Sequence, residues 1–507
     1  MKAFLMHRAK DFELERVLPP QERDLTQDLE LERLFAAMAR GDKFLFEVAQ
    51  KAVLASLTDL EDIVYRQRVM NDCIEQSSTV REIYALAVEA IEQERKIFWG
   101  FLKYPDGILH RSVQAMEMFV MLLKKLRRIA GLHADEFKSD GFVAFFEMLR
   151  VELADEYFQS VEEHLKQLRF RHGVLIGAHL GRGNKGTEYV LREPPKRKQW
   201  WRQWIPFGED SALTLIIAER DEAGMRALSE LRGRGINLAA NAVAQSADHI
   251  LSFFTMVRAE LGFYIGCLNL RGLLAEKGEP LCFPAPVAAG KSSLDCRGLY
   301  DPCLSLSLRD RAVGNDVNAD GTLLVMITGA NQGGKSTFLR SIGLAQLMMQ
   351  CGMFVAAEAF RSNVCEALYT HFRREEDPTM TSGKLDEELN RMSEIAGRVT
   401  PNCMLLLNES FSATNEREGS EIASSIVLAL LEAEIKVCFV THSFELANGF
   451  YRQGADTALF LRAERQADGG RTFKLAEGEP LPTSYGEDLY NRIFDEAPDV
   501  GDATPRA

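Results

Sequence analysis

The sequence predicts an α/β domain in the second half of the chain and a mainly α-helical domain before it. Three observations predict this. A glycine-rich string at residues 328–337 follows the apolar run 323–327 and opens a helical pattern. Two further short apolar runs, 403–407 and 437–440, have the length and composition of buried strands. From 236 to 279 no proline interrupts the chain and apolar residues recur at helical spacing, which predicts one long helix.

The glycine-rich string has the spacing of a phosphate-binding loop, or P-loop: it reads T-G-A-N-Q-G-G-K-S-T. Its glycines let successive backbone N–H groups face a phosphate, and the next helix favours negative charge at its N-terminus. We therefore expect ATP and Mg²⁺ as cofactors, with Lys335 on the β- and γ-phosphates and Ser336 on the metal. The nucleotide contacts expected here are Gly329, Asn331, Gly333, Gly334, Lys335, Ser336 and Thr337. A glycine turn with a chance lysine is the alternative, and the flanking strand and helix argue against it.

Polar residues follow the other two apolar runs. In a P-loop ATPase the strand beside the P-loop strand delivers one acidic residue to Mg²⁺ and often a second to the attacking water. We assign the 403–407 strand to that place, so Glu409 is expected to activate the water. Asn408 is the expected metal ligand, but its amide oxygen carries no charge and should bind Mg²⁺ weakly. His442 follows the 437–440 strand, where it is expected to sense the γ-phosphate or hold the water; a packed turn histidine is the alternative.

Taken together, these motifs resemble those of the MutS family of DNA mismatch-repair ATPases. The family's P-loop reads T-G-P-N-x-x-G-K-S-T, its next motif D-E-x-x-x-G-T-x-x-x-D-G and its switch T-H-x-x-E-L. This chain has N-E-S-F-S-A-T-N-E-R-E-G at 408–419 and T-H-S-F-E-L at 441–446. The family's N-D pair and terminal S-Y-G have counterparts at 315–316 and 484–486. The resemblance covers residues 296 to 495, and a shorter stretch at 56–67 is similar to the family's helical core.

The resemblance implies an α/β P-loop ATPase domain of the ABC type preceded by a helical core and lever domain. We expect the core and lever over 1–295, the ATPase domain over 296–495 and a flexible acidic tail over 496–507. The family's G-x-S-T serine reaches the nucleotide of a partner subunit, and its nearest counterpart here is Ser382. The implied protein is a homodimer in the cytoplasm, without a membrane, whose partner is DNA and which ATP switches in DNA repair or recombination control.

Family members that read mismatches carry an amino-terminal domain ahead of the helical core. Here the core-like segment begins within the first few dozen residues, so we expect a short member that lacks this domain. Its DNA ligand is then expected to be a branched or otherwise distorted duplex in place of a simple mismatch.

One segment has a local charge opposite to that of the chain, whose net charge is −14. From 166 to 202 there are ten lysines and arginines against two glutamates, and three of the four tryptophans lie at or just after its end. Glycines at 181–186 predict a hairpin turn in this insert, near 166–207. Basic residues beside aromatic ones suit a phosphate backbone and base stacking. A solvated hairpin whose tryptophans pack on the helical domain is an equal alternative. The DNA-binding candidates are Arg182, Lys185, Lys196, Arg197, Lys198, Trp200 and Trp201.

Composition and residue spacing limit which other classes of protein the sequence fits. Nine scattered cysteines without a C-x-x-C pair fit a reducing compartment and predict no zinc site. The apolar runs are shorter than the ~20 residues of a membrane span. Two alternative functions remain. The first is a nucleotide-binding scaffold with negligible hydrolysis, favoured by Asn408. The second is a transporter-type ATPase subunit, against which the missing L-S-G-G-Q string and the preceding helical half argue.

Overall fold

The computed structural model describes most of the chain, in two compact units. The described residues are 1–97, 104–171, 173–192, 214–290, 292–330, 332–374, 383–454, 458–465 and 471–482. One unit comprises residues 1–3, 78–138 and 142–258, and the other comprises 4–77, 139–141 and 259–507. Contacts thus assign most of the first 77 residues to the unit that contains the large sheet. The expected domain boundary at 295/296 stays a prediction.

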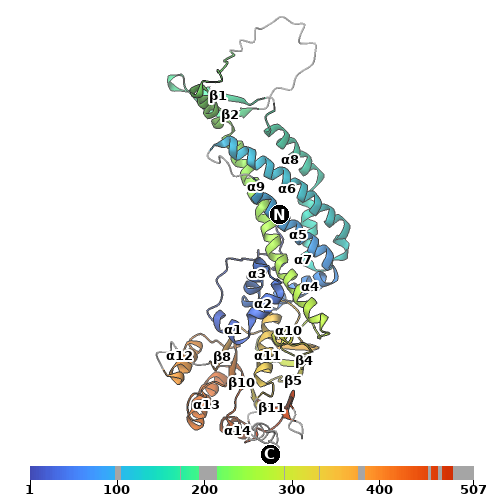
Figure 1. Cartoon of the computed structure of the whole chain (residues 1–507), viewed down its shortest axis with the longest axis vertical. Coiled ribbons are helices and arrows are strands. Elements are labelled where there is room, and N and C mark those ends of the chain that lie inside the picture. Colours follow the sequence, from blue (N-terminus) through green and yellow to red (C-terminus); the bar gives the residue numbers. More distant parts are fainter. Residues whose placement is uncertain are drawn as a thin grey trace, which may run out of the picture. The chain divides into compact units, whose positions relative to one another are not determined.

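Among its described residues, the first unit consists of helices and one hairpin (Figure 1). Its helices are most of α5 (Ser77–Lys96), α6 (Pro105–His133), α7 (Asp140–Glu152), α8 (Asp155–Leu168) and the first part of α9 (Glu222–Glu276), with the short 3₁₀ turn η1 (Ala134–Glu136). Proline in the first turn of α6 costs no hydrogen bond, because the first helical N–H groups have no partner within the helix. Phe119 of α6 stacks on Phe254 of α9 at 6.0 Å between ring centroids, and both rings are buried.

The long helix α9 begins earlier than its apolar pattern predicts. It has 55 residues and starts at Glu222, where the sequence shows no apolar stripe. Ion pairs one turn apart, from Glu222 to Arg226 and from Glu230 to Arg234, support this exposed first part. By length and composition α9 is able to cross a membrane, but 72% of its apolar window is buried inside the structure, as in a core helix.

The predicted hairpin is present in the first unit. Strands β1 (Leu175–Leu180) and β2 (Gly186–Arg192) pair antiparallel around the 3₁₀ turn η2 (Arg182–Asn184). Gly183 takes a φ of 68° in this turn, a conformation that glycine adopts without strain.

The second unit combines helices with two sheets. Helices α1 (Glu22–Asp28), α2 (Leu31–Ala39), α3 (Lys43–Leu54) and α4 (Leu60–Glu75) come from the first 77 residues. The smaller sheet has the order β3 (Ala285–Val287), β7 (Ala359–Asn363), β4 (Leu294–Leu299), β5 (Asn315–Asn318). The larger has the order β12 (Arg471–Glu477), β11 (Ala458–Arg465), β6 (Leu324–Thr328), β10 (Lys436–Val440), β9 (Met404–Asn408), β8 (Leu368–Phe372).

The larger sheet is parallel except for β12, and helices cover both of its faces. On one face α13 (Glu416–Glu432) and α14 (Phe444–Arg452) pack on Leu405, Leu407 and their neighbours. On the other face, α11 (Lys335–Gln350) approaches Leu406. Successive side chains of a strand point to opposite faces, so Leu406 faces away from Leu405 and Leu407. Two shorter helices, α10 (Pro302–Ser307) and α12 (Lys384–Ala396), complete the unit. Burial on both faces explains why these strands read as continuous apolar runs.

The strand order corrects one expectation. The strand that ends in Asn408 does not lie beside β6, because β10 lies between the two. Val440 of β10 pairs with Ile327 on one side and with Asn408 on the other. All three strands are parallel, so their carboxyl ends still meet at one edge of the sheet. The expected residues therefore come together although the neighbour relation was wrong.

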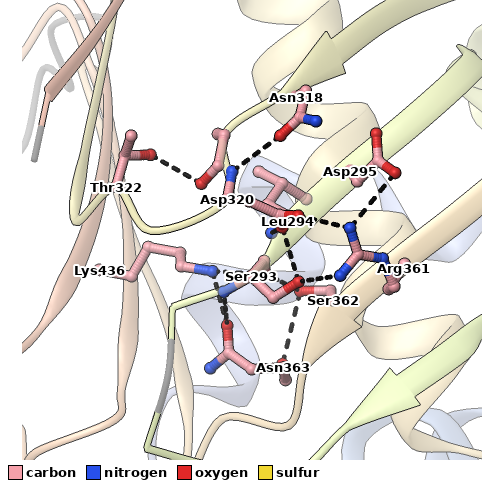
Figure 2. A network of polar contacts seen from close by, with 11 residues as sticks. Ser293, Leu294, Asp295, Asn318, Asp320, Thr322, Arg361, Ser362, Asn363 and Lys436 are labelled. Atoms are coloured by element: carbon pink, nitrogen blue, oxygen red, sulfur yellow. Dashed lines mark hydrogen bonds and ion pairs between the residues drawn. The ribbon is translucent and has the colours of Figure 1, made fainter.

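A polar network, buried at Lys436 and Asn363 and partly exposed at Arg361, joins the two sheets at the opposite edge (Figure 2). Lys436, at the start of β10, donates to the carbonyl oxygen of Ser293 at 2.8 Å and to Oδ1 of Asn363 at 2.6 Å. Arg361 forms ion pairs with Asp295 and Asp320 on the smaller sheet. These contacts fix the smaller sheet relative to β10.

Candidate nucleotide site

The glycine-rich loop connects β6 to α11 in the predicted way. Thr328 ends the strand, Gly334 precedes the helix with a φ of 90°, and Lys335 is its first residue. A Cβ atom on Gly333 would lie 2.7 Å from Cβ of Ala463, and Gly329 has a φ of 112°. Glycine is thus required at these positions both for the turn and for the close approach of β11. Asn331, another expected contact, lies outside the described residues.

Lys335 places its ammonium group inside this loop. The side chain is buried, and Nζ donates to the carbonyl oxygens of Gly329 at 2.9 Å and Ala330 at 2.8 Å. Burial lowers the pKa of Lys335 to about 8, the nearby charge of Arg471 acts in the same direction, and Glu409 opposes them. The group is therefore cationic at neutral pH, in a position to meet an anion bound at the loop.

Ser336 and Asn408, the two expected metal ligands, are in direct contact, and their role toward a metal stays a prediction. The Ser336 hydroxyl, in the first turn of α11, donates to Oδ1 of Asn408 at the end of β9, at 3.0 Å. Each residue offers a metal an oxygen atom, the ligand type that Mg²⁺ prefers, and both oxygens are uncharged. Within the described residues no cluster of three or more His, Cys, Asp or Glu side chains is placed to hold a metal ion. A metal at this pair would need phosphate oxygens and water for its remaining ligands.

Glu409 and His442 are in direct contact. Nε2 of His442 donates to Oε1 of Glu409 at 2.6 Å, and Nη1 of Arg373 lies 3.9 Å from Oε2. The His442 hydrogen bond is the largest cause that holds the pKa of Glu409 below its usual value; burial opposes it, and the charges of Lys335 and Arg373 add to it. Glu409 is therefore an ionised carboxylate at neutral pH, as a general base must be.

Lys335, Ser336 and Glu409 border a cavity of about 550 Å³, and Asn408 and His442 lie behind this lining, in contact with Ser336 and Glu409. One wall is the glycine-rich loop with Ser336, Thr337 and Glu409, and the opposite wall is formed by residues of the segment 299–315. The second wall contains apolar side chains such as Leu299, Tyr300 and Val313. The cavity is thus polar at the loop, and its second wall combines these apolar side chains with the charged residues Asp301, Asp310 and Arg311.

Strand β12 adds residues to the site that the sequence did not reveal. Phe473 lines the cavity, and Arg471 donates to Oε1 of Gln332 in the loop at 2.5 Å. Asn315 holds this strand: its amide nitrogen donates to the Phe473 carbonyl at 3.2 Å, and its oxygen accepts from the Leu475 N–H at 2.8 Å. The first residue of the N-D pair noted in the sequence therefore fixes β12 beside the cavity, while the second, Asp316, accepts from the Gly298 N–H at 2.6 Å. No local pattern marks Phe473, because its approach depends on the fold.

Of the predicted DNA contacts, the structure describes only Arg182 and Lys185, and neither lines this cavity. Arg182 and Lys185 are exposed on the hairpin of the first unit. Lys196, Arg197, Lys198, Trp200 and Trp201 lie outside the described residues, and so does Ser382. These assignments stay predictions.

Two protein-family models match this chain, one in each half. The model of the MutS2 N-terminal domain matches residues 58–277, and the model of MutS domain V matches residues 325–489. The first match begins inside the stretch 56–67 that resembled a helical core.

Individual relatives agree with these matches. The DNA mismatch repair protein MSH3 of Phaeosphaeria nodorum is 27% identical over 316 residues, which are 59% of this chain and 28% of that protein. The DNA mismatch repair protein MutS of Thermus aquaticus is 33% identical over 167 residues, 33% of this chain and 20% of the relative. MutS of Microcystis aeruginosa is 24% identical over 276 residues, 52% and 31% of the two chains. The chain thus matches less than a third of each of these proteins.

Proposed function

Because the chain belongs to the MutS family, we propose that it is an ATP-switched DNA-binding protein that hydrolyses ATP at the cavity beside Lys335. One observation carries the catalytic part. Lys335, Ser336, Asn408, Glu409 and His442 come from three neighbouring parallel strands and converge at their carboxyl ends. That edge is where open parallel sheets bind their ligands.

In the proposed reaction each residue has one task. The loop N–H groups and the Lys335 ammonium bind the phosphates and balance their charge. The Glu409 carboxylate accepts a proton from the attacking water, and His442 holds that carboxylate in place. Ser336 and Asn408 would hold Mg²⁺, which would supply positive charge to stabilise the charge that develops on the transferred phosphate. The apolar wall and Phe473 would enclose the base.

Steady-state ATP turnover tests this assignment. Lys335→Ala should abolish tight ATP binding in a folded protein, and Glu409→Gln should bind ATP without turning it over. Lys51→Ala is a suitable control, since that lysine donates to the Arg16 carbonyl and lies in the same unit away from the cavity. Unchanged ATP affinity in Lys335→Ala, or parental turnover in Glu409→Gln, would refute the site.

We propose DNA as the macromolecular ligand, in mismatched, branched or distorted form. Membership of the family supports DNA binding, and the relatives' names refer to mismatch repair. Helix α9 contributes residues to both units, so one continuous helix offers a route by which ATP binding could act on DNA binding. A gel-shift panel of duplex, mismatched, branched and single-stranded DNA, with and without ATP, identifies the ligand. Equal affinity for all four, unaffected by ATP, would refute the proposal.

A homodimer is part of the same proposal. The segments 381–388 and 410–419 are rich in polar residues, and a second subunit could complete the nucleotide site through them. Sedimentation at micromolar concentration should show a dimer that ATP tightens. A monomer with and without nucleotide would contradict this. The nine cysteines are all free in the structure, which agrees with the proposed cytoplasmic location.

The scaffold with negligible hydrolysis is the second candidate. The neutral pair of Ser336 and Asn408 favours it, because neither side chain carries a negative charge that would attract Mg²⁺. Turnover near zero together with tight ATP binding would select it.

A further inference from the structure

The residues around the proposed base have an unusual backbone. Glu409 and Phe411 both have positive φ values, 54° and 62°. Side chains with a Cβ atom adopt this left-handed region at a cost in free energy, so surrounding contacts must hold it. The backbone N–H of Glu409 donates to the Val440 carbonyl at 2.8 Å, which fixes one end of the segment. The other end of the segment, which follows Glu409, needs a second contact with the surrounding structure.

The edge strand β8 supplies that attachment through His371. Its side chain is fully buried, and it pairs with Leu407 in β9. Nε2 of His371 lies 3.0 Å from the carbonyl oxygen of Glu388 in α12. A carbonyl oxygen only accepts, so Nε2 carries the proton of the ring. Burial lowers the pKa of His371 to about 4, hence the ring is neutral and Nδ1 is an acceptor.

Ser410 is the group that meets this acceptor. Its buried hydroxyl lies 2.7 Å from Nδ1 of His371 and also 2.7 Å from the His371 carbonyl oxygen. The imidazole ring stacks on Phe411, with 5.4 Å between ring centroids and 20° between the ring planes. One histidine thus contacts both residues that follow Glu409 and ties them to α12.

We propose that His371 is a positioning residue for Glu409: through Ser410 and Phe411 it holds the left-handed segment that aims the carboxylate at His442 and the cavity. The proposal rests on the proposed ATP hydrolysis. His371 does not itself line the cavity. Its effect is therefore expected on the chemical step and not on ATP binding.

Kinetics of three variants separate this role from simple packing. His371→Leu and Ser410→Ala should each lower kcat by roughly 10- to 100-fold, because misplacement of a catalytic group by about 1 Å costs rates of that order. KM and the affinity for a non-hydrolysed ATP analogue should not change. The double variant should be no slower than the worse single variant, since both changes break one attachment. Ser362→Ala is the matched control: this buried serine donates to the Ser293 carbonyl in the other sheet, and its removal should leave kcat unchanged.

Parental kcat in folded His371→Leu and Ser410→Ala would overturn the proposal, as would multiplicative effects in the double variant. If the wild-type protein shows no turnover, the proposed ATP hydrolysis is refuted. The crystal structure of His371→Leu then tests whether His371 positions Glu409. A Glu409 that no longer accepts the hydrogen bond from His442 supports the positioning role. An unchanged Glu409–His442 distance and unchanged φ values would overturn it.

Discussion

The hydroxyl of Ser336 donates a hydrogen bond to Oδ1 of Asn408 at 3.0 Å, which joins the first turn of α11 to the end of β9. The two residues are 72 positions apart in the chain. The contact brings together two neutral oxygen ligands at the place where a phosphate-bound Mg²⁺ is expected. Because neither ligand carries a negative charge, we expect the affinity of this pair for Mg²⁺ to be low.

Asn408→Asp should strengthen Mg²⁺ binding. A carboxylate adds one negative charge at the same position without changing the side-chain size, and a gain of about 1.4 kcal/mol corresponds to tenfold in affinity. We expect the Mg²⁺ concentration for half-maximal turnover to fall about tenfold or more. Asn402→Asp, just before the opposite end of the same strand, is the control and should leave this value unchanged. A Mg²⁺ dependence identical to the wild type in Asn408→Asp would remove Asn408 from the metal site.

The sequence allowed the proximity of Ser336 and Asn408 to be expected because each partner is marked locally. Ser336 follows the lysine of the loop, and Asn408 ends an apolar run that is buried on both faces. The order of the strands was predicted wrongly, since the runs at 404–408 and 436–440 look alike and no residue in either shows which one pairs with β6. Phe473 was missed for a related reason: Asn315, more than 150 positions away, holds it at the cavity. The start of α9 was missed because charged pairs, not an apolar stripe, support it.

ATP binding should weaken above about pH 8. The pKa of Lys335 in the free protein is lowered to about 8 by burial, so its ammonium loses its proton as the pH rises through that value. The neutral amine no longer balances the phosphate charge. We expect kcat/KM, which reports the free enzyme, to fall on a basic limb near pH 8, while kcat stays constant over the same range because bound phosphate retains the proton. A flat kcat/KM between pH 7 and 9.5 would show that Lys335 does not bind the phosphates.

His442→Phe should move the acid limb of kcat to higher pH. The hydrogen bond from His442 is the main cause that lowers the pKa of Glu409, so its removal raises that pKa toward or above the ordinary value. The base then becomes protonated at a higher pH than in the wild type. Turnover between pH 4.5 and 8 measures this shift. An acid limb that does not move would mean that another group takes the proton.

Lys436→Met should cost more stability at pH 9.5 than at pH 7.5. Burial lowers the pKa of Lys436 to about 8 in the folded protein, from 10.5 for an ordinary lysine. Between these values the unfolded chain binds more protons, so the contribution of Lys436 to folding becomes more favourable as pH rises. From about pH 8 to 9.5 the gain is roughly 2 kcal/mol, at about 1.4 kcal/mol per pH unit. Urea unfolding of both proteins at the two pH values measures the difference, and a difference independent of pH would contradict the assigned pKa.

Charge and stacking make separable contributions to DNA binding by the basic segment. Neutralising Lys196, Arg197 and Lys198 together should weaken binding to duplex DNA and reduce the slope of log affinity against log salt by about 0.9 for each phosphate that the protein no longer neutralises. Replacing Trp200 and Trp201 by alanine should act mainly on single-stranded or distorted DNA, where an exposed base stacks with about 1–3 kcal/mol. Salt titrations of duplex and branched DNA with both variants distinguish the two effects, because stacking does not change the number of counterions released. If both variants remain folded and bind every DNA as the wild type does, the segment is structural, and DNA must contact another surface such as the exposed first part of α9.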